Sequence, residues 1–158
     1  MANKETKRLG NKGFSLVELI VVIAIMAVLV GVLAPQFIKY VEKSRQGTDI
    51  TNLDSIKSVV VSYYSDKEGG YLPTSVVIDG NSGEYELTIT GTTEPDAASS
   101  DDVLEQGGVK DTKVKGKWDA NKAPKATWDL QNNTWTYDAL SSYYKVNNAN
   151  AGNSIVAK

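Results

Sequence analysis

The chain has 158 residues, enough for one domain of ordinary size, and its formal net charge is −2. It has no cysteine, which excludes disulfides and thiolate metal sites, and no histidine, which is the commonest general base. It also has no phosphate-binding glycine loop. We therefore predict neither an enzyme nor a metal or cofactor. Residues 1–13 carry four basic side chains against one acidic one, so the remainder is acidic and gives no support for nucleic-acid binding.

An apolar segment follows the basic N-terminus. Residues 14–34 contain only Ser15 and Glu18 as polar side chains, and residues 19–34 are apolar without interruption. As a helix, this segment spans roughly 31 Å, close to the ~30 Å hydrocarbon core of a bilayer. We therefore predict a transmembrane helix at 14–34 with the basic leader on the cytoplasmic side and the C-terminal domain outside.

Two other interpretations of this segment stay open. A buried helix of a soluble protein would need a less polar remainder of the chain to cover it. A secretory signal peptide fits the basic start, but its apolar core usually has about 7–15 residues, and cleavage after Ala34 would leave Pro35 as the first mature residue. Both fit the sequence less well than a membrane span.

The helical pattern continues beyond the membrane segment. Gly31 and Pro35 interrupt its far end, and because proline removes a backbone donor and clashes with the preceding turn, we expect a kink or local melting there. Apolar residues then recur at three- and four-residue spacings, which predicts an amphipathic continuation of the helix over residues 35–66. They include Ile38, Val41, Leu53, Ile56, Val60 and Tyr63.

The remainder, residues 67–158, is predicted to form an antiparallel sheet domain. Residues 84–90 alternate strictly between polar and apolar side chains, as a half-buried strand does. Two weaker strands are expected at 143–146 and 155–157. The predicted fold class is α+β, a long N-terminal helix packed on a C-terminal antiparallel sheet.

A hairpin is the firmest local prediction in this domain. Residues 126–138 form two apolar-alternating runs centred on Asn132-Asn133, a pair that tolerates the positive φ of a tight turn. The turn and the alternation agree in placing four apolar side chains on one face. The predicted pairs are Leu130 with Trp135 and Trp128 with Tyr137.

Residues 91–125 show little periodicity, and their first half is acidic whereas their second half is basic. A solvated loop is the simpler interpretation. The alternative is a contact between the oppositely charged halves of neighbouring copies, which predicts salt-sensitive association that is lost when Asp101 and Asp102 become asparagine.

The stretch Lys12-Gly13-Phe14-Ser15-Leu16-Val17-Glu18, followed by the apolar run and Pro35, closely resembles the class III leader and N-terminal helix of type IV pilins. The resemblance implies that residues 1–13 are a cytoplasmic leader. A membrane prepilin peptidase would remove it between Gly13 and Phe14 and methylate the new amine of Phe14. An assembly ATPase and a platform protein would then move subunits from the membrane into a helical homopolymer with the N-terminal helices as its core.

The resemblance therefore implies a structural pilin, first a single-pass protein of the cytoplasmic membrane and then part of an extracellular pilus that serves adhesion, motility or biofilm formation. A pseudopilin of type II secretion or of competence is the alternative within this class. A membrane-anchored carbohydrate-binding module is the alternative in another class. It would use Trp128, Trp135 and Tyr137 as an aromatic strip, whereas we expect them in the sheet–helix core.

Glu18 has three interpretations. Near the cytoplasmic end of the segment, its charge would cost less than the ~2.5–3.5 kcal/mol expected at the helix centre. After cleavage it could pair with the Phe14 amine of its own chain, four residues away, or with that amine in an adjacent subunit. We favour the last, in which Glu18 sets the register of assembly, because an unpaired carboxylate is costly in an apolar filament core.

The chain departs from the best-known Gram-negative pilins, which close a C-terminal loop with a cysteine pair. Without cysteine, this region must be held by strand pairing or by a bound ion. The absence of cysteine is more like pilins of Gram-positive anaerobes or the major pseudopilins of type II secretion. Those pseudopilins often carry a calcium loop near the C-terminus. Its acidic residues 94–102 lack the alternating spacing of such a loop, so we predict no metal.

Overall fold

A computed structural model describes residues 13–65, 72–91, 99–139, 141–147 and 154–158. The leader residues 1–12, the predicted helix end at residue 66 and the acidic residues 94 and 96 lie outside these ranges. The chain divides into two compact units, Met1–Lys39 and Tyr40–Lys158. The domain boundaries predicted at residues 34 and 66 stay predictions.

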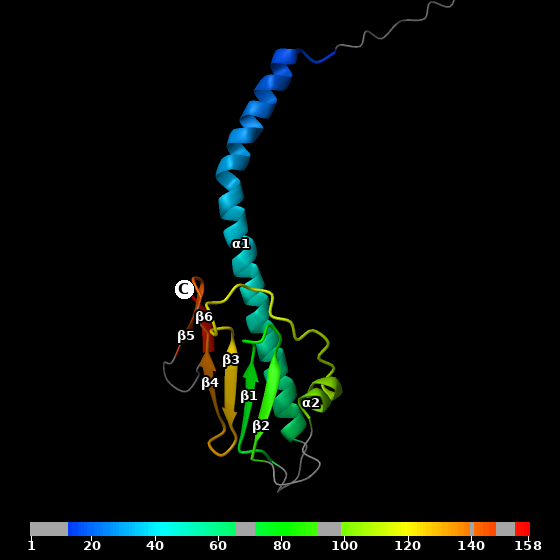
Figure 1. Cartoon of the computed structure of the whole chain (residues 1–158), viewed down its shortest axis with the longest axis vertical. Helices are drawn as coiled ribbons and strands as arrows, with labels where there is room; N and C mark the ends of the chain where they lie inside the picture. Colours follow the sequence, from blue (N-terminus) through cyan, green and yellow to red (C-terminus); the bar gives the residue numbers. More distant parts are fainter. Residues whose placement is uncertain (1–12, 66–71, 92–98, 140, 148–153) are drawn as a thin grey trace, which may run out of the picture. The chain divides into compact units, whose positions relative to one another are not determined.

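Helices and antiparallel strands together form the described part of the chain, which confirms the α+β prediction (Figure 1). Four strands make one sheet in the order β2-β1-β3-β4, and the last two strands pair with each other. The elements are α1 (Leu16–Ser65), β1 (Ser75–Asp79), β2 (Glu86–Thr90), α2 (Ser100–Gln106), β3 (Lys125–Asp129), β4 (Thr134–Asp138), β5 (Tyr144–Asn147) and β6 (Ser154–Ala157).

The second half of α1 and the four-stranded sheet share one hydrophobic core. Each fully buried aliphatic side chain contributes about 1.5–3 kcal/mol, so the apolar stripe of α1 holds the helix on the sheet. Ile38, predicted on this stripe, is 67% exposed, because the buried residues of α1 begin only at Gln46. The fully buried aliphatic residues of α1 and β1 are Leu53, Ile56, Val60, Val76 and Ile78.

The hairpin of β3 and β4 forms where predicted but in a different register. Trp128 pairs with Trp135 and Ala126 with Tyr137, so the predicted pairs of Leu130 with Trp135 and of Trp128 with Tyr137 are wrong by two residues. Because side chains alternate with period two, an even slip keeps every residue on its predicted face.

The loop chemistry explains this slip. A two-residue turn at Asn132-Asn133 would need positive φ at both positions, and of the two only Asn133 has it, with φ of 48°. The Asp129 carboxylate instead accepts hydrogen bonds from the backbone N–H groups of Gln131 and Asn132, at 3.0 and 3.2 Å. These bonds favour a wider loop that begins directly after Asp129.

The sequence patterns do not predict β1 or α2. β1 is an inner strand of the sheet, and α2 lies within the stretch expected to be a loop. The Ser99 hydroxyl accepts the Asp102 N–H at 3.2 Å and the Asp102 carboxylate accepts the Ser99 N–H at 3.0 Å, a capping box. Hydrogen bonds from the Ser99 hydroxyl and backbone hold the pKa of Asp102 below its ordinary value. Asp102 therefore has a role inside its own chain.

Residues 109–118, here called the strap, are fastened to α1 by a buried carboxylate. Asp49 is fully buried and accepts hydrogen bonds from Lys115 N–H, Gly116 N–H and Trp118 Nε1–H at 2.7, 2.8 and 2.9 Å. The approach is close, because a Cβ at Gly116 would lie 2.5 Å from Gln46 Cγ. The three hydrogen bonds to Asp49 thereby hold the strap against α1.

The predicted C-terminal strands are confirmed as β5 and β6. Tyr144 fixes this hairpin on α1, since its hydroxyl donates to the Lys43 carbonyl at 3.4 Å. A Cβ at Gly47 would lie 3.0 Å from the same hydroxyl, so a small residue suits this close contact. Strand pairing and contacts with α1 thus position the C-terminal hairpin.

Candidate functional site

The start of α1 contains Glu18, the charged residue of the predicted membrane segment. Its Oε2 accepts a hydrogen bond from the Ser15 N–H at 2.8 Å, and the Ser15 carbonyl accepts the Leu19 N–H at 3.2 Å. Ser15 therefore occupies the N-cap and Glu18 the third helical position, where a carboxylate satisfies an orphan donor and complements the helix dipole. The spacing Ser15-x-x-Glu18 is the signal in the sequence that could have predicted this cap.

Gly13 and Phe14 precede the helix in non-helical backbone. The Phe14 side chain is 92% exposed, and a Cβ at Gly13 would meet nothing within 4 Å. Gly13 and Phe14 are both exposed in the described part of the chain. The structure places Gly13, Phe14 and Glu18 at one end of α1.

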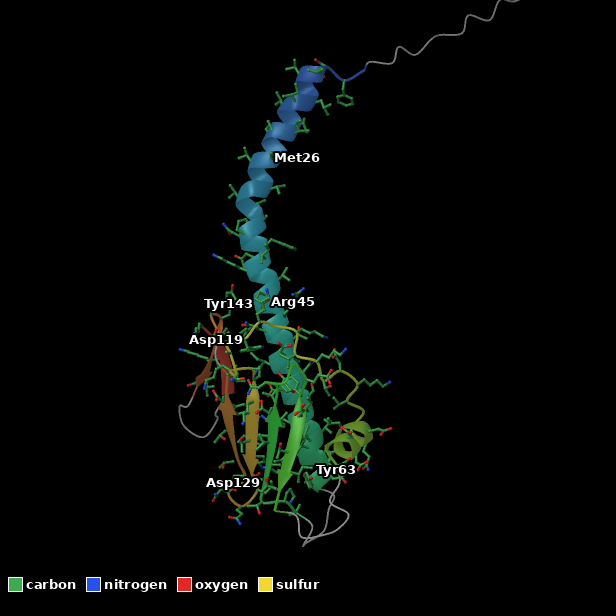
Figure 2. The ribbon with its side chains drawn as sticks, in the orientation of Figure 1. Met26, Arg45, Tyr63, Asp119, Asp129 and Tyr143 are labelled. Atoms are coloured by element: carbon green, nitrogen blue, oxygen red, sulfur yellow. The ribbon has the colours of Figure 1, made fainter. Side chains whose placement is uncertain are left out.

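The first half of α1 exposes an apolar surface on all sides. Side chains around Met26 stand out from the helix in every direction (Figure 2). Met26 itself is 61% exposed, and the most apolar window of α1, with mean hydropathy of 3.1, is entirely unburied. By length and composition this helix could cross a membrane, a test that a signal sequence near an N-terminus also passes. An apolar surface of this kind needs lipid or protein around it.

Gly31 and Pro35 lie about four to five helical turns beyond Glu18. The helix is unbroken at both residues, so local melting is absent, and the kink stays a prediction. A Cβ at Gly31 would meet nothing within 4 Å, so no packing among the described residues requires glycine there.

The aromatic residues of the hairpin face α1, as predicted for core residues. Trp128 is 7% exposed and stacks on Trp135 with ring centroids 5.4 Å apart. The Lys57 ammonium of α1 lies 5.2 Å from the Trp135 ring and 4.9 Å from the Tyr137 ring. Lys57 thus covers the ring faces that a sugar would need.

Comparison with known proteins links the exposed helix to a family motif. Residues 8–34 match the family described as the prokaryotic N-terminal methylation motif. The type IV major pilin protein PilA of Myxococcus xanthus is 38% identical to this chain over 58 residues, which are 37% of this chain and 26% of that protein. The N-terminal segment is type IV pilin-like.

The fimbrial protein EcpC of Eikenella corrodens matches the chain to a similar extent, with 39% identity over 56 residues, 35% of this chain and 37% of that protein. The chain thus covers only 26% and 37% of the length of these two curated relatives. No solved structure matches it. The residues that match the family motif, 8–34, include Gly13, Phe14, Glu18 and Gly31.

Proposed function

We propose that this chain is a structural subunit of a type IV pilus or a related filament. The observation that carries the proposal is the first half of α1, an apolar surface that no other described part of the chain covers and that begins within the pilin-like motif. In a filament, the same halves of neighbouring subunits would cover one another. The relatives are named as pilin and fimbrial proteins, which supports a structural role over an enzymatic one.

Processing would prepare the subunit for assembly. A prepilin peptidase would cut the bond between Gly13 and Phe14 and methylate the new amine, leaving residue 14 as the mature N-terminus. The cleavage creates a positive charge one helical turn before Glu18. The precursor would stay in the cytoplasmic membrane through residues 14–34 until an assembly ATPase and platform protein add it to the extracellular filament.

Glu18 would act at two stages in this scheme. In the unprocessed chain its carboxylate caps α1 through the Ser15 N–H. In the filament, where a buried carboxylate needs an opposite charge, the Phe14 amine of an adjacent subunit would supply it. Only one axial position of the neighbour brings the two charges together, so the pair would set the register.

Two alternatives differ in how the structure bears on them. A pseudopilin of secretion or competence uses the same processing and fits the same helix. A membrane-anchored carbohydrate-binding module needs an accessible aromatic platform, and Lys57 covers Trp135 and Tyr137 while Trp128 is buried. The geometry favours the filament over the binding module.

Mechanical shearing of cells followed by mass analysis tests the proposal. We expect the protein in the released fibres, with Phe14 as a methylated N-terminus. The matched control is a chain with Gly13→Val, which should keep its leader and stay in the membrane fraction. Wild-type protein that keeps residues 1–13, or that shearing never releases, would contradict the proposed function.

A further inference from the structure

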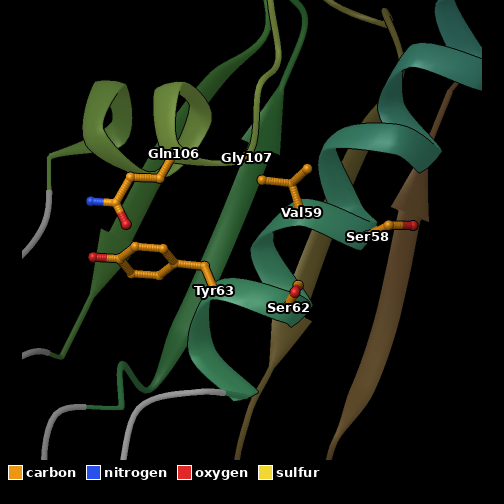
Figure 3. Close-up of a pocket in the computed structure, with 6 residues that line it drawn as sticks. All are labelled: Ser58, Val59, Ser62, Tyr63, Gln106 and Gly107. Atoms are coloured by element: carbon orange, nitrogen blue, oxygen red, sulfur yellow. The ribbon is translucent and has the colours of Figure 1, made fainter.

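A groove between the last turns of α1 and helix α2 has a volume of about 360 Å³ (Figure 3). It is lined by Ser58, Val59, Ser62, Tyr63, Gln106 and Gly107. None of these six residues is charged, and their mixture of hydroxyl, amide and apolar groups does not indicate one class of ligand. The side chains that do indicate a partner lie on α1 itself, just beyond the predicted membrane segment.

Residues 37–45 of α1, here called the junction, expose large apolar side chains. Phe37, Ile38 and Tyr40 are 68%, 67% and 69% exposed. A helix of a soluble domain would turn such side chains toward a core, but the buried residues of α1 begin only at Gln46. Tyrosine, with an apolar ring and a polar hydroxyl, is enriched where a helix passes from hydrocarbon into water. The apolar side chains of the junction therefore suit a membrane–water interface.

The junction also carries three cations. Lys39 and Arg45 are exposed and Lys43 is half-buried, and none of them belongs to an ion pair among the described residues. Its one acidic residue is Glu42, whose carboxylate accepts the backbone N–H of Lys117. Three cations against one carboxylate give the junction a net charge of +2. Its exposed charge is therefore available to an anionic partner.

The position of the junction along the helix matches the thickness of a bilayer. Lys39 lies 21 residues after Glu18 in an unbroken helix, which corresponds to roughly 32 Å along the axis. The hydrocarbon core of a bilayer is about 30 Å thick. When the precursor spans the membrane as proposed, with Glu18 near the cytoplasmic surface, Lys39 therefore lies at the opposite surface. There a lysine or arginine can lay its methylene stem along hydrocarbon and extend its charge among the headgroups.

The orientation of the span does not account for cations at this end of it. Lysine and arginine are in excess on the cytoplasmic side of membrane proteins, and in the proposed topology the basic leader already supplies that excess. Basic side chains next to a span attract anionic lipid headgroups, and this attraction acts only within about a Debye length of the surface. The cations of the junction are therefore explained by an anionic partner at the outer surface.

We propose that the junction binds anionic lipid headgroups at the outer surface of the membrane and so fixes the depth of the precursor before assembly. Its apolar side chains lie at the level of the headgroups, and its three cations pair with lipid phosphates. This inference rests on the proposed function and describes its membrane-bound stage. A second copy at the same height would present the same cations, and a soluble polyanion would leave the apolar side chains in water. Lipid satisfies both sets of side chains.

Local fluorescence quenching in vesicles tests the contact. The chain has no cysteine, so Ile38→Cys creates a single attachment point for a fluorophore in the full-length chain. The vesicles consist of phosphatidylcholine with a trace of nitroxide-labelled lipid, either phosphatidylglycerol or phosphatidylcholine. Quenching should show about fivefold local enrichment of the anionic lipid at low salt, the preference expected of about one cation at an anionic surface. The enrichment should vanish at about 1 M salt, where the Debye length falls to ~3 Å.

Matched double variants separate the junction from the general charge of the chain. Lys39→Gln with Arg45→Gln removes two exposed cations of the junction and should abolish most of the enrichment. Lys110→Gln with Lys113→Gln removes two exposed cations of the strap and should leave the enrichment unchanged. The nitroxide quenches only near contact, so lipids bound by the basic leader in the other leaflet, about 30 Å away, do not contribute.

Three outcomes overturn the inference. They are equal quenching by the two lipids at low salt, enrichment that persists in the double variant of the junction, and a fluorophore that neither lipid reaches because a second copy covers it. Each of these leaves the filament function intact. A fluorophore at Met26→Cys tests the membrane-bound stage itself, since lipid with a nitroxide deep in its acyl chain should quench it in every variant. Failure there contradicts the proposed spanning precursor and this inference with it.

Discussion

Replacing Asp49 by alanine is expected to destabilise the unit Tyr40–Lys158 by about 3–5 kcal/mol. The carboxylate is fully buried and holds three N–H donors of the strap at 2.7, 2.8 and 2.9 Å. Hydrogen bonds to a charged group contribute about 1.5–3 kcal/mol each. Their plain sum overstates the loss, because deleting the carboxylate also removes the cost of its own desolvation. The remaining 3–5 kcal/mol is a large part of a typical ~5–15 kcal/mol stability.

Thermal unfolding of the full-length chain in detergent micelles, followed by circular dichroism, measures this loss. The melting temperature should fall by roughly 10–20 °C. Hydrogen exchange at the Lys115 and Gly116 amides should accelerate more than exchange in β1, because the strap is released first. Asp49→Asn should lose less than Asp49→Ala, because the amide oxygen can still accept the Gly116 and Trp118 N–H groups, whereas the amide nitrogen would face the Lys115 N–H as a second donor.

Asp54→Ala is the matched control on the same helix. The Asp54 side chain is 60% exposed and lies 3.6 Å from the Lys57 ammonium, so its loss should cost less than about 1 kcal/mol. If Asp49→Ala also cost less than about 1 kcal/mol, or left exchange of the strap amides unchanged, the carboxylate would not be what fastens the strap.

Three further predictions concern other parts of the chain. Glu18→Val should be cleaved normally but enter filaments poorly beside wild-type subunits, as mass analysis and subunit counting would reveal; normal incorporation would discard its register role. Gly107→Ala should lower the free energy of unfolding by about 1–3 kcal/mol, because its Cβ would lie 2.0 Å from Val59 Cγ1. Adding Val59→Ala to the same chain should recover part of this loss, and the absence of such a rescue would refute the steric cause. Burial alone raises the pKa of Asp79, but the Asn81 N–H and the Lys125 ammonium outweigh it and lower the pKa below 3.8. The difference in free energy of unfolding between wild type and Asp79→Asn should therefore be constant at neutral pH and disappear as the pH falls below 3.8. A difference that instead grew in acid would show that the pKa of Asp79 is raised and not lowered.

The sequence predicts the parts of this protein whose signals are local. The apolar run fixes the first half of α1 by length and composition, and the spacing of Leu53, Ile56 and Val60 fixes the buried stripe of the second half. Alternation gives the faces of the β3–β4 hairpin correctly, but its register depends on which residues can take positive φ and on where the Asp129 carboxylate bonds. Turn chemistry was the weaker of the two signals.

Other elements depend on information that the sequence pattern does not contain. β1 has only two fully buried side chains, Val76 and Ile78, and it becomes an inner strand through partners far along the chain. α2 is short, and only its Ser99 capping box and the glycines that follow it mark it. The strap is fixed by Asp49, a residue 66 positions away from Lys115. The Asp49 carboxylate has no signature in the sequence.

For the candidate site, the sequence motif around Gly13 and Phe14 is enough to predict the positions of cleavage and methylation. The structure adds that both residues are exposed and that Glu18 caps α1. The roles proposed for Gly31, Pro35 and Glu18 would depend on contacts with neighbouring copies, which the sequence and the structure of a single chain do not contain.

The hydrogen bonds to Asp49 hold the strap of this chain without any thiol chemistry. A fold closed by a disulfide is complete only after an oxidant and often an isomerase have acted on it. Here the strap is held by hydrogen bonds from three N–H groups to the Asp49 carboxylate. The chain contains no cysteine that could be oxidised or mispaired. The folded state is therefore expected to be the same in strongly reducing and in aerated surroundings.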